Sequence, residues 1–221
     1  MYKFCVLTAG EGKRNAYAKG TNKSLLKLGG VPIIDRILAK VPRGVRVLIV
    51  VGHNAHLVEA AVKNVTFVRV EKYRGMWSGP GYSLLQCAPL LQCPFIFTAC
   101  DTIVLEDYPE PDRNWVGVST VEDTEPYLTV TTAKGLVTKV YDKIKNAPSH
   151  MSSIGVMGIR DYREFWEGLS NPHLVNGEHQ TTDGLNALIA KGLHYKYFTW
   201  FDTGTTGGYE NADRYFSRNL S

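Results

Sequence analysis

Short apolar runs alternate with segments of amphipathic-helix spacing through the first hundred residues. The apolar runs cover residues 2–9, 45–51, 65–70 and 95–99, and the helix-like segments cover 32–40, 55–63 and 82–91. Strands that are separated by helices need crossover connections, and these connections build parallel sheets with both faces covered. The pattern therefore predicts an α/β, Rossmann-like layered fold with a mainly parallel central sheet.

The second half of the chain has a different pattern of elements. Closely spaced β-rich runs occur at residues 115–121, 127–132, 136–141 and 153–159, followed by helix-like segments at 160–168, 182–190 and 208–218 and a strand at 195–200. Runs with turn residues between them indicate antiparallel or mixed pairing. Because no linker rich in Gly, Pro or Ser intervenes, we expect one domain, 1–221, with one lobe at about 1–112 and a smaller β-rich lobe at about 113–221.

Composition narrows the classes of function. A chain of 221 residues with 44% apolar residues can bury roughly 70% of its unfolded surface in one core. The net charge is only +4, and the basic residues are spread out except for a group in the opening segment, Lys13, Arg14, Lys19, Lys23 and Lys27. This distribution favours a local anion site over a nucleic-acid surface.

The cysteines and the apolar runs indicate the cellular compartment of the protein. The four cysteines show no CxxC spacing, which favours buried reduced thiols over disulfides or a zinc site. No cationic leader precedes a long apolar segment, and no apolar run reaches ~18 residues. We expect a soluble, cytoplasmic protein that has no membrane partner.

The first apolar run leads into Gly10-Glu11-Gly12-Lys13-Arg14. Glycines let backbone N–H groups approach a ligand, and the cations beyond them suit a polyphosphate. A dinucleotide fingerprint needs a third glycine and an immediate helix, and a P-loop needs Ser or Thr after the lysine. Both patterns fail, so the sequence predicts a different phosphate loop, with a solvated basic loop as the alternative.

Two aspartates follow apolar strands. Asp101 comes after the run that ends at Cys100, and Asp202 lies in Trp200-Phe201-Asp202-Thr203-Gly204-Thr205. Ligands of parallel α/β sheets bind beyond the carboxyl ends of the strands, where both carboxylates and the glycine loop would meet. Carboxylates placed there suit Mg²⁺, although either aspartate alone is also a common cap of a turn.

Together these motifs resemble the nucleotidyltransferase (NTP transferase) family, which includes sugar-1-phosphate nucleotidylyltransferases and phosphocholine cytidylyltransferases and whose fold is similar to that of type A glycosyltransferases. Residues 7–14 resemble the family's LAAGxGxR loop, residues 22–26 its PKxL step, residues 30–34 its GxPxI step, and residues 200–205 its WxDTGT segment. Two departures stand out. Asn22 replaces a proline, which we expect to loosen the loop, and Asp142-Lys143 stands where EKP is usual.

The resemblance implies roles for individual residues. Arg14 and Lys23 would be catalytic, and Asp101 and Asp202 would hold Mg²⁺ as the cofactor. The remaining nucleotide-binding residues would be Leu7, Ala9, Gly10, Glu11, Gly12, Lys13, Gly79 and Ser83, together with Asp101, and the acceptor-binding residues would be Lys143, Tyr127 and Asp183. The first lobe would then bind the nucleotide and the second the acceptor. The partners would be an NTP and a phosphorylated small molecule, without nucleic acid, and a homodimer is compatible with the sequence.

The implied reaction is an in-line attack of the acceptor phosphate on the α-phosphorus, with pyrophosphate leaving. A phosphomonoester is already anionic at neutral pH because its second pKa is near ~6, so no general base is required. CTP is favoured, with UTP next, because Glu71-Lys72-Tyr73 and Tyr82-Ser83-Leu84 look like segments of the phosphocholine enzymes. The acceptor would be a phosphocholine-like or other phosphorylated head group, or a sugar 1-phosphate.

Aromatic residues in the second lobe bear on this choice. Trp115, Tyr127 and Tyr141 could hold a quaternary amine by cation–π attraction, although most aromatics in such strands are core residues. Two other functions remain open. A glycosyltransferase that uses a nucleotide sugar would usually show DxD where this chain has Asp101-Thr102-Ile103, and a non-catalytic nucleotide sensor would keep the same binding residues.

Overall fold

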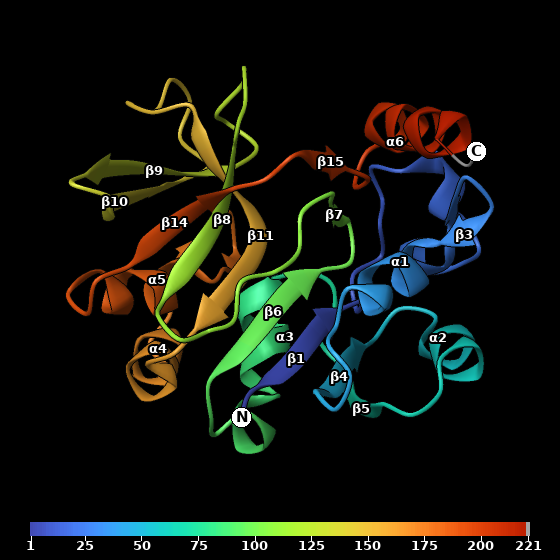
Figure 1. The fold of residues 1–221 in the computed structure, drawn as a ribbon, viewed down its shortest axis with the longest axis horizontal. Coiled ribbons are helices and arrows are strands. Elements are labelled where there is room, and N and C mark those ends of the chain that lie inside the picture. The colour runs from blue at the N-terminus through green and yellow to red at the C-terminus, as the bar shows by residue number, and fades with distance from the viewer. Residues whose placement is uncertain (220–221) are drawn as a thin grey trace.

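The computed structural model describes residues 1–219, in which nine strands form one mixed sheet of order β5-β4-β1-β6-β11-β8-β14-β10-β9 (Figure 1). Their bounds are β1 Lys3–Leu7, β4 Arg46–Val51, β5 Thr66–Arg69, β6 Phe95–Ala99, β8 Trp115–Thr120, β9 Leu128–Ala133, β10 Leu136–Asp142, β11 Met151–Ile159 and β14 His194–Tyr197. The helices are α1 Ile33–Ala39, α2 Ala55–Ala61, α3 Pro80–Leu85, α4 Tyr162–Leu169, α5 Thr182–Ile189 and α6 Thr206–Arg218. This arrangement confirms the predicted α/β class.

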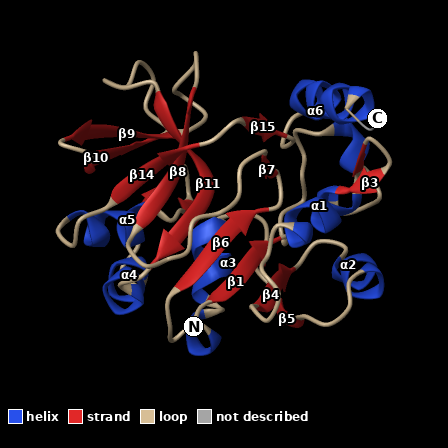
Figure 2. Ribbon diagram, in the orientation of Figure 1, coloured by secondary structure: helices blue, strands red, loops and turns tan. Residues whose placement is uncertain are grey.

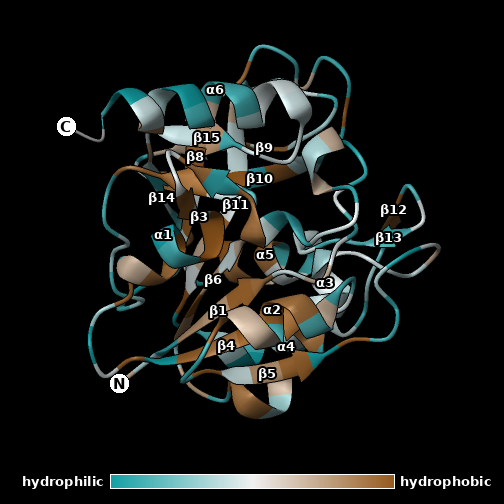
Figure 3. Ribbon diagram, turned by 90° about the vertical axis from the view of Figure 1, so that its right-hand side faces the viewer, coloured by the Kyte–Doolittle hydropathy of each residue, from teal (hydrophilic) through white to brown (hydrophobic). Residues whose placement is uncertain are grey.

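The first half of the sheet is parallel. β1 pairs with β4 and β6, and β4 pairs with β5, all in parallel register. Alternate residues of β1 point to opposite faces, so that Phe4 and Val6 join one buried cluster while Cys5 and Leu7 join the other. Helices α3, α4 and α5 cover one face, and α1, α2 and α6 gather on the other (Figure 2). Figure 3 shows mainly apolar residues along β1 and β6 in the interior and mainly polar residues along α6.

The second half continues the same sheet in mixed directions. β11 runs antiparallel to both β6 and β8, and β14 returns parallel to β8. β9 and β10 form an antiparallel hairpin at the edge of the sheet. The sheet is therefore continuous where the sequence suggested a boundary between lobes.

Two elements end earlier than their patterns predict. The expected helix at 82–91 is α3, followed by a separate 3₁₀ turn at Ala88–Leu90, because Pro89 lacks the N–H that an α-helix needs. The expected strand at 195–200 breaks after Tyr197, where the Glu106 carboxylate accepts hydrogen bonds from the Thr199 backbone N–H and hydroxyl.

This break has a consequence for the carboxyl edge of the sheet. The chain resumes as β15, Trp200–Asp202, which pairs antiparallel with β7, Thr102–Val104, and places Asp202 opposite Thr102. Sequence patterns missed this ribbon, as well as the short pairs β2 Lys27–Leu28 with β3 Val31–Pro32, and β12 Leu174–Val175 with β13 Glu178–His179. No helix in the described residues is long and apolar enough to cross a membrane.

Candidate functional site

Two adjoining cavities open at the carboxyl ends of β1 and β6. The larger, of about 460 Å³, is lined by every residue expected to bind the nucleotide and also by Arg14, Lys23 and Lys143. The smaller, of about 180 Å³, is lined by Tyr127, Asp142 and Asp202 among others. Leu7, Arg14, Asp101 and Lys143 line both cavities, and the site thus consists of two chambers with a shared wall.

Backbone bonds hold the opening loop against the far end of the chain. Gly12 adopts φ +68°, a left-handed conformation that suits glycine. The Asn15 side chain donates to the Thr203 carbonyl at 2.9 Å, and the Arg14 carbonyl accepts from the Thr206 N–H at 3.1 Å. These bonds place the guanidinium of Arg14 beside the segment that carries Asp202.

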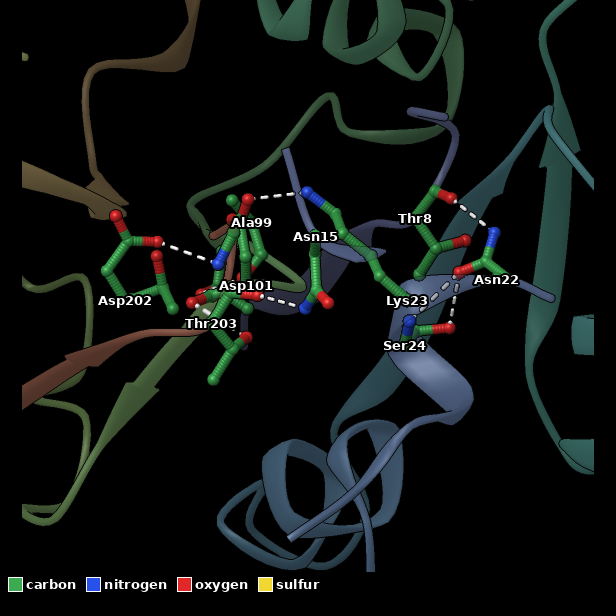
Figure 4. A network of polar contacts seen from close by, with 12 residues as sticks. Thr8, Asn15, Asn22, Lys23, Ser24, Ala99, Asp101, Asp202 and Thr203 are labelled. Carbon is green, nitrogen blue, oxygen red and sulfur yellow. Dashed lines mark hydrogen bonds and ion pairs between the residues drawn. The ribbon is translucent and has the colours of Figure 1, made fainter. Parts of the chain in front are cut away.

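Asn22 fastens the loop that carries Lys23 (Figure 4). This fully buried side chain donates to the carbonyls of Thr8 at 2.8 Å and His53 at 2.9 Å, and its oxygen accepts from the N–H and hydroxyl of Ser24. All its hydrogen-bonding positions are used within the fold. The expectation that this departure from the family motif loosens the loop is wrong, because the amide replaces the rigidity of proline with four bonds.

Lys23 and Asp101 form a buried ion pair at the junction of the chambers. Lys23 Nζ lies 2.5 Å from Asp101 Oδ2, and both side chains are about four-fifths buried or more. Burial is the largest single influence on Asp101 and opposes its ionisation, but attraction to Lys23, the hydrogen bond from Lys23 and smaller contributions together outweigh burial and lower the pKa of that carboxyl. The same attraction outweighs burial for the ammonium and raises the pKa of Lys23. Both groups are therefore charged at neutral pH.

Three charged groups crowd around Gly204. A Cβ at this position would lie 2.9 Å from Asp202 Oδ1, 3.0 Å from Asp101 Oδ2 and 3.4 Å from Arg14 Nη2. The ribbon of β7 and β15 brings the two carboxylates together, since the Thr203 N–H donates to the Asp101 carbonyl at 2.9 Å. The structure thus gathers the three predicted groups around one glycine.

The chemistry of the two carboxylates beside Gly204 suits a hard divalent cation. One oxygen of each carboxylate lies close to this glycine, and Mg²⁺ typically takes one or two protein carboxylates together with phosphate and water oxygens. The described residues contain no cluster of three or more His, Cys, Asp or Glu side chains that could hold a metal. A cation held by Asp101 and Asp202 would therefore depend on oxygens from a bound phosphate.

Tyr127 orients Asp202 from the smaller chamber. Its hydroxyl donates to Asp202 Oδ2 at 3.0 Å, while the Gly204 N–H donates to Oδ1 at 2.8 Å. Burial, and secondly the neighbouring Asp202 charge, raise the pKa of Tyr127 to about 12. The Tyr127 ring meets the Trp200 ring edge to face, with centroids 5.7 Å apart.

The other aromatic candidates lie elsewhere. Trp115 is buried and packs against Phe198, and the Tyr141 ring lies 5.0 Å from Lys139 Nζ. Neither residue lines the two chambers. Trp200, which also lines the smaller chamber, supplies the second aromatic surface there instead.

Lys143 and Asp142 lie where the chambers meet. Lys143 has φ +53°, and its Nζ lies 3.3 Å from Glu178 Oε2, which also accepts from the Gln180 side chain at 2.8 Å. Asp142 accepts a hydrogen bond from the Thr182 hydroxyl, and burial raises its pKa. Asp183, in contrast, lines neither chamber, because its carboxylate accepts from the backbone and ring of His173.

The glycines at 79 and 81 serve packing as well as access. A Cβ on Gly79 would lie 2.5 Å from the His179 carbonyl oxygen, and one on Gly81 would overlap the Gln180 carbonyl oxygen. The His179 N–H donates to the Ser78 carbonyl at 2.8 Å. These glycines therefore let the β12–β13 hairpin close one side of the larger chamber.

Sequence reasoning missed several residues of that wall. Tyr73, Arg74, Glu178 and Gln180 line the larger chamber. Tyr73 belongs to the segment that suggested a pyrimidine nucleotide, and its cationic neighbour Arg74 was the available signal. From the sequence, Glu178 was ambiguous between a structural role and a substrate contact, and Gln180 carried no signal, because the pairing of the hairpin with residues 77 and 78 is what brings them to the chamber.

Comparisons with known proteins agree with this architecture. Residues 4–108 match the family model of the MobA-like NTP transferase domain. The chain superimposes on UDP-glucose pyrophosphorylase complexed with UDP-glucose, with a TM-score of 0.82 and 20% identity over 99% of both chains. A putative glucose-1-phosphate thymidylyltransferase from Bacillus anthracis gives 0.82 and 19% identity over 99% of this chain and 96% of that one.

A third solved structure, UDP-glucose pyrophosphorylase from Acinetobacter baumanii, has a TM-score of 0.78 and 16% identity, and the match covers 100% of this chain and 95% of that one. No curated protein sequence matches the chain. At these identities the structural likeness establishes the fold. The family match, residues 4–108, includes most but not all of the residues that line the larger chamber.

Proposed function

Since residues 4–108 match the model of the MobA-like NTP transferase domain and the whole chain has the fold of UDP-glucose pyrophosphorylase, we propose that the protein is a nucleotidyltransferase. It transfers NMP from an NTP to a phosphorylated small molecule and releases pyrophosphate. The observation that carries this proposal is the convergence of Arg14, Asp101 and Asp202 around Gly204, where the two chambers meet.

The two chambers divide the substrates. The triphosphate lies in the larger chamber along the backbone of residues 10–12, and the acceptor lies in the smaller one beside Tyr127. Arg14 lines both, and its planar fork binds the oxygens of phosphate groups in either chamber. Lys23 adds a compact positive charge beside Asp101 that stabilises the build-up of negative charge in the transition state.

Asp101 and Asp202 are the residues that would hold Mg²⁺. An ion held there would supply positive charge that neutralises the triphosphate and the leaving pyrophosphate. The acceptor phosphate is anionic at neutral pH, since its second pKa is near ~6. The protein therefore contributes positioning and charge stabilisation, with no residue acting as a general base.

For the acceptor, we propose a sugar 1-phosphate or a phosphocholine-like head group. The names of the structural neighbours refer to UDP-glucose and to glucose 1-phosphate, which supports the sugar. A second observation supports the cationic head group: the Tyr127 and Trp200 rings line the smaller chamber together with the Asp142 carboxylate, and aromatic faces attract quaternary amines. For the nucleotide we propose CTP first and UTP next, from the segment that includes Tyr73.

A screen of pyrophosphate release tests the proposal. The four NTPs are each combined with glucose 1-phosphate, phosphocholine and phosphoethanolamine in the presence of Mg²⁺. We expect release with one NTP and one acceptor class, and loss of release when EDTA removes the metal. A glycosyltransferase would instead release a nucleotide from a nucleotide sugar, and a sensor would bind NTP without turnover, so silence in every combination would refute the transferase function.

A further inference from the structure

A third cavity, of about 390 Å³, lies at the opposite edge of the sheet. It is lined by Arg113, Asn114, Lys134, Gly135, Leu136, Arg160, Asp161, Lys191, Gly192 and His194. Asn114 and His194 stand at the beginnings of β8 and β14, which run parallel to each other, so this edge is the amino end of both strands. In Figure 1 it lies on the side of α4 and α5, away from β7 and β15. The cavity is therefore separate from the catalytic chambers, which share none of these residues.

The lining is strongly basic. Four cationic side chains, from Arg113, Lys134, Arg160 and Lys191, face one carboxylate, that of Asp161. Arg113 contacts Asp112 and Lys191 pairs with Glu164. Lys134 and Arg160 form no ion pair with any residue of the described chain, 1–219. Two uncompensated cations on one cavity wall favour an anionic ligand.

A buried amide organises the wall. Asn114 is 2% exposed, and its oxygen accepts from the backbone N–H groups of Arg160 and Asp161, each at 3.0 Å. Its nitrogen donates to Asp161 Oδ2 at 2.6 Å, and its own carbonyl accepts from the His194 N–H at 2.9 Å. These bonds fix the backbone of Arg160. They also give the Asp161 carboxylate, the one acidic group of the lining, a hydrogen-bond donor. The cavity is thus a built feature of the fold.

Lys134 occupies an unusual position for a lysine. It is the first residue of the two-residue turn between β9 and β10, with φ +50°, and Gly135 follows with φ +80°. Such turns favour Gly, which lacks a Cβ, or Asn and Asp, whose short polar side chains hydrogen-bond locally, whereas other side chains strain the left-handed backbone. The backbone at Lys134 is therefore strained, and the lysine places a positive charge at the cavity.

We propose that this cavity is a second anion-binding site, for a compact phosphate-bearing small molecule such as pyrophosphate or a sugar phosphate. Arginine and lysine together supply a bidentate fork and a point charge for phosphate oxygens. The imidazole of His194 is the one aromatic ring among the lining residues. The lining therefore suits a phosphate group better than a nucleobase.

NMR titration of the wild-type protein with inorganic pyrophosphate, without divalent metal, tests the site. Backbone amides of Gly135 and Gly192 report on this cavity, while those of Gly10 and Gly12 report on the larger catalytic chamber in the same spectra. We expect a saturable shift at both pairs. The double variant Lys134→Gln/Arg160→Gln should weaken pyrophosphate binding, as measured at Gly135 and Gly192, by about tenfold or more, because each substitution removes a charge-assisted hydrogen bond to the ligand. The binding curve measured at Gly10 and Gly12 should not change.

The matched control is Lys63→Gln/Lys72→Gln, which removes two exposed cations outside the cavity. This pair should change binding at Gly135 and Gly192 by less than about twofold, as expected for screened surface charges. Absence of a saturable shift at these two glycines overturns the proposal. Equal weakening by the control pair also overturns it, because diffuse surface attraction would then account for the binding. The readout is independent of turnover, so it stands whether or not nucleotidyl transfer is found.

Discussion

The two halves of the sheet contribute to the catalytic crevice in different ways. Residues 1–112 contribute loops that follow parallel strands, with Gly10–Arg14 after β1 and Asp101 after β6. Residues 113–219 contribute side chains that lie on strands, Asp142 in β10 and Asp202 in β15, or directly before one, Tyr127 before β9. The first half therefore contributes a glycine-containing loop together with the side chains of Arg14, Lys23 and Asp101, and the second half contributes further side chains.

This difference bears on what the halves recognise. The backbone of residues 10–12 can bind phosphate oxygens whatever the attached group, and the family match ends at residue 108, close to the end of the first half. The chamber beside Tyr127 and Trp200 depends on side chains, which can change with the acceptor while the fold is kept. We infer that the first half fixes the reaction and that the second half selects the acceptor.

Asp101→Asn should give the largest effect, because it removes charge from the shared wall of the two chambers. We expect turnover to fall by at least ~100-fold, comparable to the loss of one preorganised electrostatic group. Steady-state pyrophosphate release measures it, with the exposed Asp112→Asn as the control. Turnover within a few-fold of wild type would remove Asp101 from the catalytic assignment.

Stability must be measured beside activity for this variant. Lys23 loses its buried partner in Asp101→Asn, and an unpaired buried charge is destabilising. Thermal unfolding then shows whether the protein is still folded at the assay temperature. Lys23→Ala should also lower turnover by at least ~100-fold, and the double variant should lose less stability than the sum of the single changes, because the two side chains interact.

Gly204→Ala tests whether the close approach of Arg14 and Asp101 from the first half to Asp202 from the second half is needed for activity. The added Cβ would crowd Asp101, Asp202 and Arg14 at 2.9–3.4 Å, and a shift of reacting groups by about 1 Å can cost ~100-fold. We expect turnover to fall by about 10- to 100-fold with little loss of stability. The control is Gly207→Ala, whose Cβ meets nothing within 4 Å. Equal activity of the two variants would show that turnover does not depend on the arrangement of charged groups around Gly204.

The sequence predicted the first half of the site well, for a physical reason. A glycine loop or an aspartate directly after a buried strand must lie at the carboxyl edge of a parallel sheet, so local pattern determines position. Every residue expected to bind the nucleotide accordingly lines the larger chamber. Asp202 was found in the same way, from a contiguous motif.

What the sequence could not predict depends on contacts between distant segments. Glu178 and Gln180 reach the larger chamber only because a hairpin bonds to residues 77 and 78, about a hundred positions away. The break at Thr199 depends on Glu106, which is 93 residues away. Local periodicity holds no information about either contact. The wall that residues 178–180 add to the larger chamber could therefore not be read from local sequence patterns.

Tyr127→Phe tests the second half alone. The change removes the hydroxyl that donates to Asp202 at 3.0 Å but keeps the ring against Trp200. A hydrogen bond to a charged group contributes about 1.5–3 kcal/mol, so we expect kcat/KM for the acceptor to fall by about tenfold while KM for the NTP changes little. Tyr141→Phe, outside both chambers, is the control. A rise in KM for the NTP alone would contradict the division of substrates.

Asp142→Asn should have the smallest effect, and it acts on stability. Burial raises the pKa of Asp142 in the folded protein, so the native state holds its proton more tightly than the unfolded state. The free energy of unfolding therefore falls as pH rises from the ordinary value of 3.8 through the raised pKa, and the full cost is present at neutral pH. Asparagine keeps an oxygen that can accept from Thr182 but carries no charge to bury.

The variant should thus be more stable than wild type at neutral pH, and the difference should shrink as the pH falls below that window. Urea unfolding at a series of pH values measures it, with the exposed Glu122→Gln as the control. A difference that grows toward low pH would have the wrong sign for a carboxyl whose pKa is raised by burial. Confirmation would mean that the acceptor chamber retains a destabilising buried carboxylate, as expected where a charge is kept for binding a ligand and not for the fold.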